Sequence, residues 1–251
     1  MTAREELRAR GAEIRRHLGL TNSSGAELLP GFANLTDEMV YGRVWARSGL
    51  ALEERMLATL SALTSKQYLP QLGLMVGSAL HIGLTPRLIQ EVMLHCAMYV
   101  GIPSAESSLE VVNRVLAEKE IPQPEVTLNE ADLDAMASVG EATKRELHGE
   151  RADAGYAAPD SAAAELYATA VDYLYGEVWN RPDITLRQRM VCSIAAFTAN
   201  QMESQQRKFF RSALSVGLSR GEVLEIIVQT APYSGFPPAL NALAAAEEVL
   251  S

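Results

Sequence analysis

The sequence lacks the features that define several large classes of protein. Lys and Arg form no basic run of about five to eight residues, and the chain carries a net charge of −9 at pH 7. An acidic chain of this kind repels phosphate backbones, so we expect no nucleic-acid partner. No apolar stretch approaches the roughly 18 residues that suggest a membrane span, so we expect no membrane partner.

Cysteine is scarce, and its spacing excludes two kinds of site. Cys96 and Cys192 each lie within an apolar helical pattern, and neither forms a C-x-x-C pair. This spacing gives no zinc site, and we expect no metal. Buried free thiols in a reducing cytoplasm are favoured over a disulfide. The first residues, MTAREELRARGAEIRRHLG, lack the apolar segment of a signal peptide, so we expect a cytoplasmic protein.

Alternating apolar and polar residues, the pattern of β-strands, are almost absent, whereas helical periodicity runs through the chain. The sequence therefore predicts an all-α fold. The expected helices span 3–17, 34–48, 52–65, 68–82, 86–100, 104–119, 129–149, 161–179, 186–199, 202–216, 219–230 and 238–250.

An internal repeat with a fixed offset divides the chain. The segment 41–45, Tyr-Gly-Arg-Val-Trp, recurs at 175–179 as Tyr-Gly-Glu-Val-Trp, an offset of 134 residues. The register needs no gap between residues 41 and 109, so the two copies should share one backbone. The predicted organisation is an N-terminal helix in 1–33, a first unit in 34–119, a connector with one exposed helix in 120–160, and a second unit in 161–251.

One segment of each copy resembles a known family. The run SALHIGLTPRLIQEVMLHCAMYVGIPSA is similar to the carboxymuconolactone decarboxylase signature, in which an Ala-Leu-x-x-Gly turn and a Thr or Ser precede Glu-x-x-x-His-x-x-x-Tyr-x-Gly-x-Pro. The second copy reads SALSVGLSRGEVLEIIVQTAPYSGFPPA, with Gln229 in place of His95. The resemblance covers about 34–117 and 165–250.

This resemblance implies two tandem helical units like those of alkyl hydroperoxidase D and a decarboxylase branch that uses no cofactor. Family members form dimers that assemble into rings. One chain would then imitate two subunits, and we expect a homo-oligomer in which three chains imitate a hexameric ring.

The sequence departs from the family at two kinds of position. The family His four residues before the Ala-Leu-x-x-Gly turn is Met75 in the first copy and Phe209 in the second. The peroxidase branch has cysteines near Tyr68 and Gln71, and no thiol stands there or at Gln205, the repeat equivalent of Gln71. A thiol peroxidase is therefore excluded as an expected function.

Glu91, His95 and Tyr99 are the candidate catalytic residues. Glu91 and His95 are four residues apart and share one helix face, where a carboxylate can orient an imidazole, raise its pKa and make it a general acid or base. The alternative is a helix-stabilising pair or a packing contact. Tyr99, repeated as Tyr233, could donate a phenolic proton or simply pack against a neighbouring helix.

The candidate substrate contacts come from both copies. Arg55 and Arg189 could clamp a substrate carboxylate with their planar guanidinium groups. The alternative is a structural salt bridge to Glu91 or Glu225. Trp45 and Trp179 are expected as core or interface anchors, and no role is expected for His148. The further expected contacts are Tyr68, Gln71, Met75, Gln205, Glu225, Gln229 and Tyr233.

These residues and the family resemblance together predict a cofactor-independent, decarboxylase-like lyase. It would act by acid/base proton transfer on a small carboxylated or lactone-type substrate, with Glu91 and His95 handling the proton and Arg55 holding the carboxylate. Two alternatives stay open. One is a cyclisation or rearrangement enzyme of secondary metabolism, and the other is a non-catalytic binding or scaffold protein.

Overall fold

The computed structural model of the chain describes residues 2–20, 29–153 and 162–251, and every regular element in these ranges is helical. The expected boundary at residues 160 and 161 lies outside them. None of the helices described is long and apolar enough to cross a membrane. In chain order the elements are α1 (Ala3–His17), α2 (Phe32–Thr36), η1 (Asp37–Trp45), α3 (Leu52–Lys66), α4 (Leu69–His81), α5 (Pro86–Val100), α6 (Ile102–Glu118), α7 (Leu133–His148), η2 (Gly149–Arg151), α8 (Ala164–Thr169), η3 (Ala170–Glu177), η4 (Val178–Asn180), α9 (Leu186–Ala199), α10 (Glu203–Ser215), α11 (Arg220–Ser234) and α12 (Phe236–Val249).

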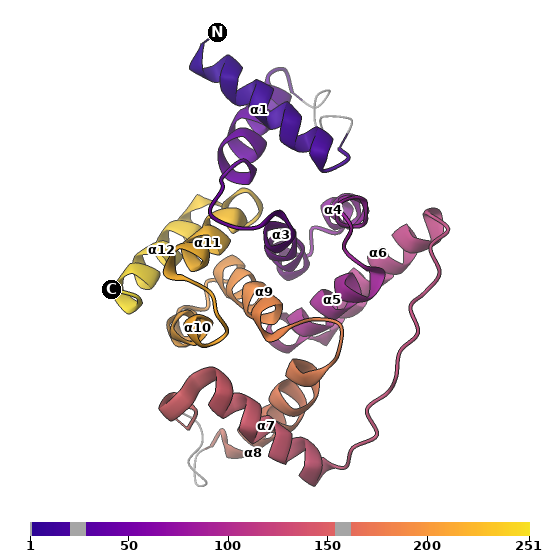
Figure 1. Ribbon diagram of the computed structural model, residues 1–251, viewed down its shortest axis with the longest axis vertical. Helices are drawn as coiled ribbons and strands as arrows, with labels where there is room; N and C mark the ends of the chain where they lie inside the picture. Colours follow the sequence, from indigo (N-terminus) through magenta and orange to yellow (C-terminus); the bar gives the residue numbers. More distant parts are fainter. Residues whose placement is uncertain (1, 21–28, 154–161) are drawn as a thin grey trace.

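Helices α3 and α9 form the centre of the molecule. Every residue of α3 from Glu54 to Thr64 is buried, as is every residue of α9 from Arg189 to Ala199. Helices buried on all sides belong in the middle of a bundle, and these two pack against each other. The remaining helices of the bundle are α4, α5 and α6 from the first unit and α10, α11 and α12 from the second (Figure 1).

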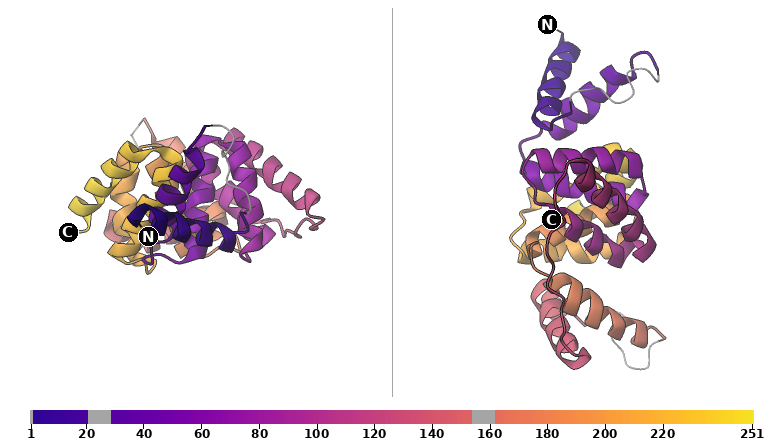
Figure 2. Two further views of the ribbon diagram at one scale, coloured as in Figure 1. Left: turned by 90° about the horizontal axis from the view of Figure 1, so that it is seen from above. Right: turned by 90° about the vertical axis from the view of Figure 1, so that its right-hand side faces the viewer.

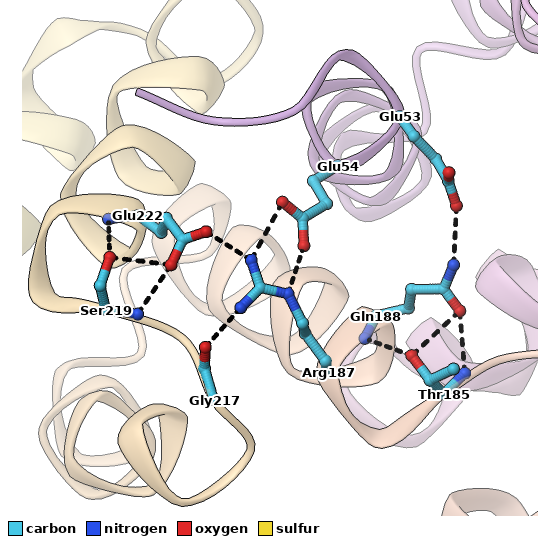
Figure 3. A network of polar contacts seen from close by, with 8 residues as sticks. All are labelled: Glu53, Glu54, Thr185, Arg187, Gln188, Gly217, Ser219 and Glu222. Carbon is cyan, nitrogen blue, oxygen red and sulfur yellow. Dashed lines mark hydrogen bonds and ion pairs between the residues drawn. The ribbon is translucent and has the colours of Figure 1, made fainter. Parts of the chain in front are cut away.

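A pseudo-two-fold axis relates the two units, as contacts between α3 and α9 show (Figure 3). The side chain of Gln188 donates to Glu53 at 2.7 Å, and Arg187 donates to Glu54 at 2.7 Å. The offset of 134 maps Glu53 onto Arg187 and Glu54 onto Gln188, so each contact is the other with its partners exchanged. Reciprocal contacts of this kind define a two-fold interface, here inside one chain.

Two helical arms project from opposite ends of the bundle (Figure 2). In the first arm α1 crosses η1, and in the second α7 crosses η3. Both crossings need glycine, because an added Cβ would lie 2.4 Å from the Leu7 carbonyl oxygen at Gly42 and 2.3 Å from the Met136 carbonyl oxygen at Gly176. Helix α7 is therefore the second unit's counterpart of α1.

The predicted connector is only partly correct. Residues 121–132 have no regular structure, but the helix expected as exposed, α7, buries Met136, Leu147 and His148. Leu7 and Met136 are 129 residues apart rather than 134, so the repeat register shifts by five between the arms and the bundle. That shift hid the equivalence of α1 and α7 in the sequence.

The signature's Thr, Ser and Gly residues begin and end helices. The Thr85 hydroxyl caps α5 by accepting from the Leu88 amide at 3.1 Å, and Ser219 caps α11 through the Glu222 amide at 3.2 Å. Gly101 and Gly235 have φ of 95° and 93°, a conformation that side chains with a Cβ rarely adopt. These positions fix where α5 and α11 stop, and so where their last-turn tyrosines lie.

Candidate functional site

Two buried polar clusters lie at equivalent places, and each combines residues of both units. We name them after the residue that distinguishes them. The His95 cluster contains Glu91, His95 and Tyr99 of α5, Arg189 and Ser193 of α9, and Trp179 of η4. The Gln229 cluster contains Glu225, Gln229 and Tyr233 of α11, Arg55 and Thr59 of α3, and Trp45 of η1.

His95 is a neutral hydrogen-bond donor in this arrangement. A guanidinium nitrogen of Arg189 lies 3.5 Å from Nδ1, and Nε2 lies 2.8 Å from Ser193 Oγ. A guanidinium group can only donate, so Nδ1 accepts and Nε2 carries the proton that it donates to Ser193. Complete burial, and then the charge of Arg189, hold the pKa of His95 well below its usual range.

The expected pairing of Glu91 with His95 is wrong. The Glu91 carboxylate instead binds guanidinium groups of Arg87 at 2.5 Å, Arg181 at 3.0 Å and Arg189 at 3.5 Å. Arg189 contacts both Glu91 and the imidazole, so the nearest charge to His95 is positive. The prediction that Glu91 raises the pKa of His95 fails for this reason.

Tyr99 joins the cluster through its phenolic oxygen. Trp179 Nε1 donates to this oxygen at 3.0 Å, and Ser193 Oγ lies 3.3 Å from it. The imidazole N–H, the indole N–H and the two hydroxyls carry four hydrogens but share only three hydrogen bonds within the cluster. One hydroxyl proton of the Ser193–Tyr99 pair is thus uncommitted within the cluster. Burial raises the pKa of Tyr99, so the phenol keeps its proton at neutral pH.

Gln229 reproduces the hydrogen bonds of a neutral imidazole. Its amide oxygen accepts from Arg55 at 3.1 Å, and its amide nitrogen donates to Thr59 at 3.1 Å. These are the repeat equivalents of the contacts that His95 makes. In the same cluster Trp45 Nε1 donates to Tyr233 at 2.8 Å. The Gln229 cluster therefore has the same hydrogen-bond pattern without the titratable ring.

We expected Arg55 to lie with Glu91 and His95, and this expectation is wrong. It donates to Glu225 at 2.7 Å and to the Arg47 carbonyl at 2.8 Å within the Gln229 cluster. The alternative of a structural salt bridge to Glu225 is confirmed. Arg189 takes the corresponding place beside Glu91, and burial lowers its pKa to about 10, so it stays cationic at neutral pH.

Three of the other expected contacts lie away from both clusters. Tyr68 and Gln71 are exposed at the start of α4, and Met75 is buried in the core. These three residues were expected because they occupy the positions of the family's cysteines and histidine. In this chain the polar groups of the His95 cluster lie instead on α5, α9 and η4. The role of the three residues as substrate contacts stays a prediction.

A pocket of about 650 Å³ lies next to the part of α5 that carries Tyr99, although no residue of the His95 cluster lines it. Met98 of α5, the residue before Tyr99, forms one wall, and Gln205 of α10 forms another. One turn after Gln205, the ring of Phe209 packs 6.3 Å from the rings of both Tyr99 and Trp179, between centroids. Phe209 thus connects the α10 wall to the cluster. The largely apolar lining comes from Met98, Ala163, Leu166, Tyr167, Thr169, Ala170, Tyr173, Leu174 and Gln205.

Four contributing residues were missed although the repeat marks them. Thr59 and Ser193 are both hydroxyl residues at the offset of 134, and Arg47 and Arg181 are both arginines at that offset. Conserved polarity between the copies was the available signal. No group of three His, Cys, Asp or Glu residues suited to a metal occurs in the ranges that the structure describes.

His148 was also misjudged, because it is buried and doubly hydrogen-bonded. Its Nδ1 lies 2.7 Å from Ser212 Oγ and its Nε2 lies 2.8 Å from the Tyr175 hydroxyl. Burial and the nearby cations lower its pKa to about 3. No repeated histidine pointed to this position. Cys96 and Cys192 are buried free thiols, as predicted.

Comparison with known families identifies both units. The model of the carboxymuconolactone decarboxylase family matches residues 30–114 and again residues 164–248. The two matches together span more than half of the chain. The chain therefore belongs to the carboxymuconolactone decarboxylase family, and it contains that family's unit twice.

Individual relatives match over one unit's length. An uncharacterized 15.0 kDa protein of Paracoccus denitrificans is 36% identical over 85 residues, 33% of this chain and 63% of that protein. The 4-carboxymuconolactone decarboxylase of Acinetobacter baylyi is 27% identical over 84 residues, 34% of this chain and 63% of the enzyme. The nitrosuccinic acid decarboxylase of Metarhizium robertsii is 34% identical over 82 residues, 33% of this chain and 57% of the enzyme. The chain thus spans less than two thirds of each relative.

One solved structure matches along the whole chain. It is a putative gamma-carboxymuconolactone decarboxylase subunit from Burkholderia xenovorans, with a TM-score of 0.59 and 19% identity, and the match covers 100% of this chain and 99% of that one. At this identity the likeness establishes a shared fold.

Proposed function

We propose that the protein is a decarboxylase-like lyase that acts on a small carboxylated or lactone-type molecule, with the His95 cluster as its reaction centre. The observation that carries the proposal is the uncommitted hydroxyl proton of the Ser193–Tyr99 pair. Loss of carbon dioxide breaks a carbon–carbon bond and leaves its electron pair on the substrate. A neutral acid must then supply a proton to carbon, and we assign this role to Tyr99.

The surroundings of Tyr99 suit this role. The hydrogen bonds from Trp179 and Ser193 to the phenolic oxygen stabilise the phenolate that remains once the proton has left. The neutral imidazole of His95 supports Ser193, and the fixed charge of Arg189 lies nearby. The spent proton is recovered from solvent.

The adjoining pocket supports an organic acid as the substrate. Its volume of about 650 Å³ lies in the range of small-molecule sites, and its walls are mainly apolar. Gln205 offers an amide that can hydrogen-bond a carboxylate or a lactone carbonyl. We propose that the substrate binds here and reaches Tyr99 past Phe209. The homology to two named decarboxylases supports the reaction class.

The test compares Tyr99→Phe with Tyr233→Phe. Both variants remove one phenol that accepts from a tryptophan, so they perturb packing alike, but only the first belongs to the His95 cluster. On a panel of carboxylated lactones, with carbon dioxide release measured, Tyr99→Phe should lower kcat by about 10²- to 10⁴-fold. Tyr233→Phe should keep the wild-type rate.

Two results would overturn the proposal. Equal rates for the two variants would remove Tyr99 from the chemistry. Absence of carbon dioxide release from every member of the panel would favour a binding or scaffold protein, the alternative that the complete burial of His95 supports.

A further inference from the structure

A second pocket, with a strongly positive lining, lies where the first arm meets the bundle, away from the His95 cluster. Its volume is about 590 Å³, and Arg10 of α1, Arg43 of η1 and Arg47 line it together with Glu225. The crossing at Gly42 brings these arginines together, because it presses η1 against the α1 backbone at Leu7. Arg10 lies one turn beyond Leu7, and Arg43 follows Gly42.

Arg10 and Arg43 have no ion-pair partner among the described residues. The acidic residues that η1 carries are already paired, Asp37 with Arg15 at 2.8 Å and Glu38 with Arg4 and Arg8 at 2.8 and 3.0 Å. Glu225 is engaged as well, by Arg47 and by Arg55.

The charge of the pocket sets the charge of its ligand. Arg47 and Arg55 share the single negative charge of Glu225, so the positive charges of Arg10 and Arg43 remain unbalanced at this mouth. Arg10 and Arg43 are both exposed, so on a chain of net charge −9 they form a local positive surface that attracts an anion.

The second arm provides an internal comparison. Its equivalent pocket, of about 260 Å³, is lined by Val139, Glu177 and Arg181. Glu177 replaces Arg43 at the offset of 134, and Val139 replaces Arg10 at the offset of 129. Arg181 is bound to both Glu91 and Glu177. The same scaffold therefore has no unpaired arginine at this mouth, so the positive charge of the first pocket is not required by the fold.

We propose that the pocket formed by Arg10, Arg43 and Arg47 binds a small dicarboxylate. Each guanidinium group presents a planar fork that matches one carboxylate. Arg10 and Arg43 come from different helices, so two separate carboxylates engage them better than one compact anion does. The dianion balances the two unpaired charges, and the small side chains of Ala46, Ser48 and Gly49 leave room for its carbon chain.

Calorimetric titration of the full chain with succinate at low ionic strength tests the site. The wild type should bind one succinate per chain. The double variant Arg10→Val with Arg43→Glu copies the second pocket, so it should keep the fold. It should weaken succinate binding by roughly 10- to 100-fold, because each charge-assisted hydrogen bond to a carboxylate supplies a large part of the affinity. Near-ultraviolet circular dichroism should be unchanged.

A matched control separates this site from general charge effects. Arg114→Glu with Arg145→Val makes the same change in net charge at exposed positions on α6 and α7 and should bind succinate as the wild type does. The proposal fails if the control weakens as much as the first double variant, if the wild type does not bind succinate, or if inorganic phosphate binds more tightly than succinate.

Discussion

His95 and Gln229 hold the same position in the two halves of the molecule and make the same pair of contacts. Each accepts from a buried arginine and hydrogen-bonds a hydroxyl, Arg189 and Ser193 for His95 and Arg55 and Thr59 for Gln229. An amide and an imidazole can exchange here because the imidazole is neutral. The fold thus needs the hydrogen-bond pattern, while only one half retains a ring that can titrate.

The exchange predicts the stability of two His95 variants. His95→Gln keeps an acceptor for Arg189 and a donor for Ser193, so the free energy of unfolding should change by less than about 1 kcal/mol. His95→Ala leaves both partners buried and unsatisfied and should lower it by about 2–5 kcal/mol. Urea unfolding measures both. Similar losses for the two variants would contradict the assigned hydrogen bonds.

Stability should fall as the solution becomes more acidic, before most carboxylates titrate. The pKa of His148 is lowered to about 3 and that of His95 is also low, so below about pH 6.5 the unfolded chain binds protons that the native chain does not. The contribution of these two histidines to the free energy of unfolding is therefore complete above about pH 6.5. Below that pH it declines by about 2.7 kcal/mol per pH unit down to about pH 5.

Urea titrations at several pH values would measure this slope. His148→Gln should halve it, because one of the two titrating groups is gone. His81→Gln, at an exposed position, should leave it unchanged. A slope that does not respond to His148→Gln would show that other groups control the acid sensitivity.

The close helix crossing in the first arm predicts a strong effect of one methyl group. Gly42→Ala places a Cβ 2.4 Å from the Leu7 carbonyl, so α1 must move away from η1. We expect a loss of about 1–3 kcal/mol, as for overpacked core sites, and faster proteolysis within α1.

Gly77→Ala is the matched control. That Cβ would meet its nearest neighbour, Lys119 Cε, at an ordinary 3.6 Å, so the change should be neutral or stabilising by up to about 1 kcal/mol. Equal behaviour of the two alanine variants would argue against the tight crossing.

The repeat made most of the fold predictable from sequence. An offset of 134 without gaps requires two copies of one backbone, and the caps at Thr85 and Ser219 mark equivalent helix starts. The arm of the second unit was missed because α7 follows a different offset, 129, since the chain between the crossing residues of α7 and η3 is five residues longer than that between the crossing residues of α1 and η1. The repeat offset of 134 alone could not reveal that α7 packs against η3 as α1 packs against η1.

The site was less predictable, because residue spacing within a helix says nothing about which helix lies opposite. Glu91 and His95 do share a face of α5, but α9 of the other unit meets that face. Arg189 therefore pairs with Glu91, and Arg55 serves the other cluster. The reciprocal arrangement needs the two-fold relation between units, which no single motif contains.

Because each cluster draws on both halves, joining the halves in one polypeptide has a chemical consequence. In a symmetric pair of identical chains, any substitution appears at two places at once. In this chain a substitution can change one of the two arm pockets, or one of the two polar clusters, without changing its counterpart. Accordingly, only one of the two clusters contains an imidazole, that of His95. The unpaired arginines, Arg10 and Arg43, lie only in the pocket beside the other cluster.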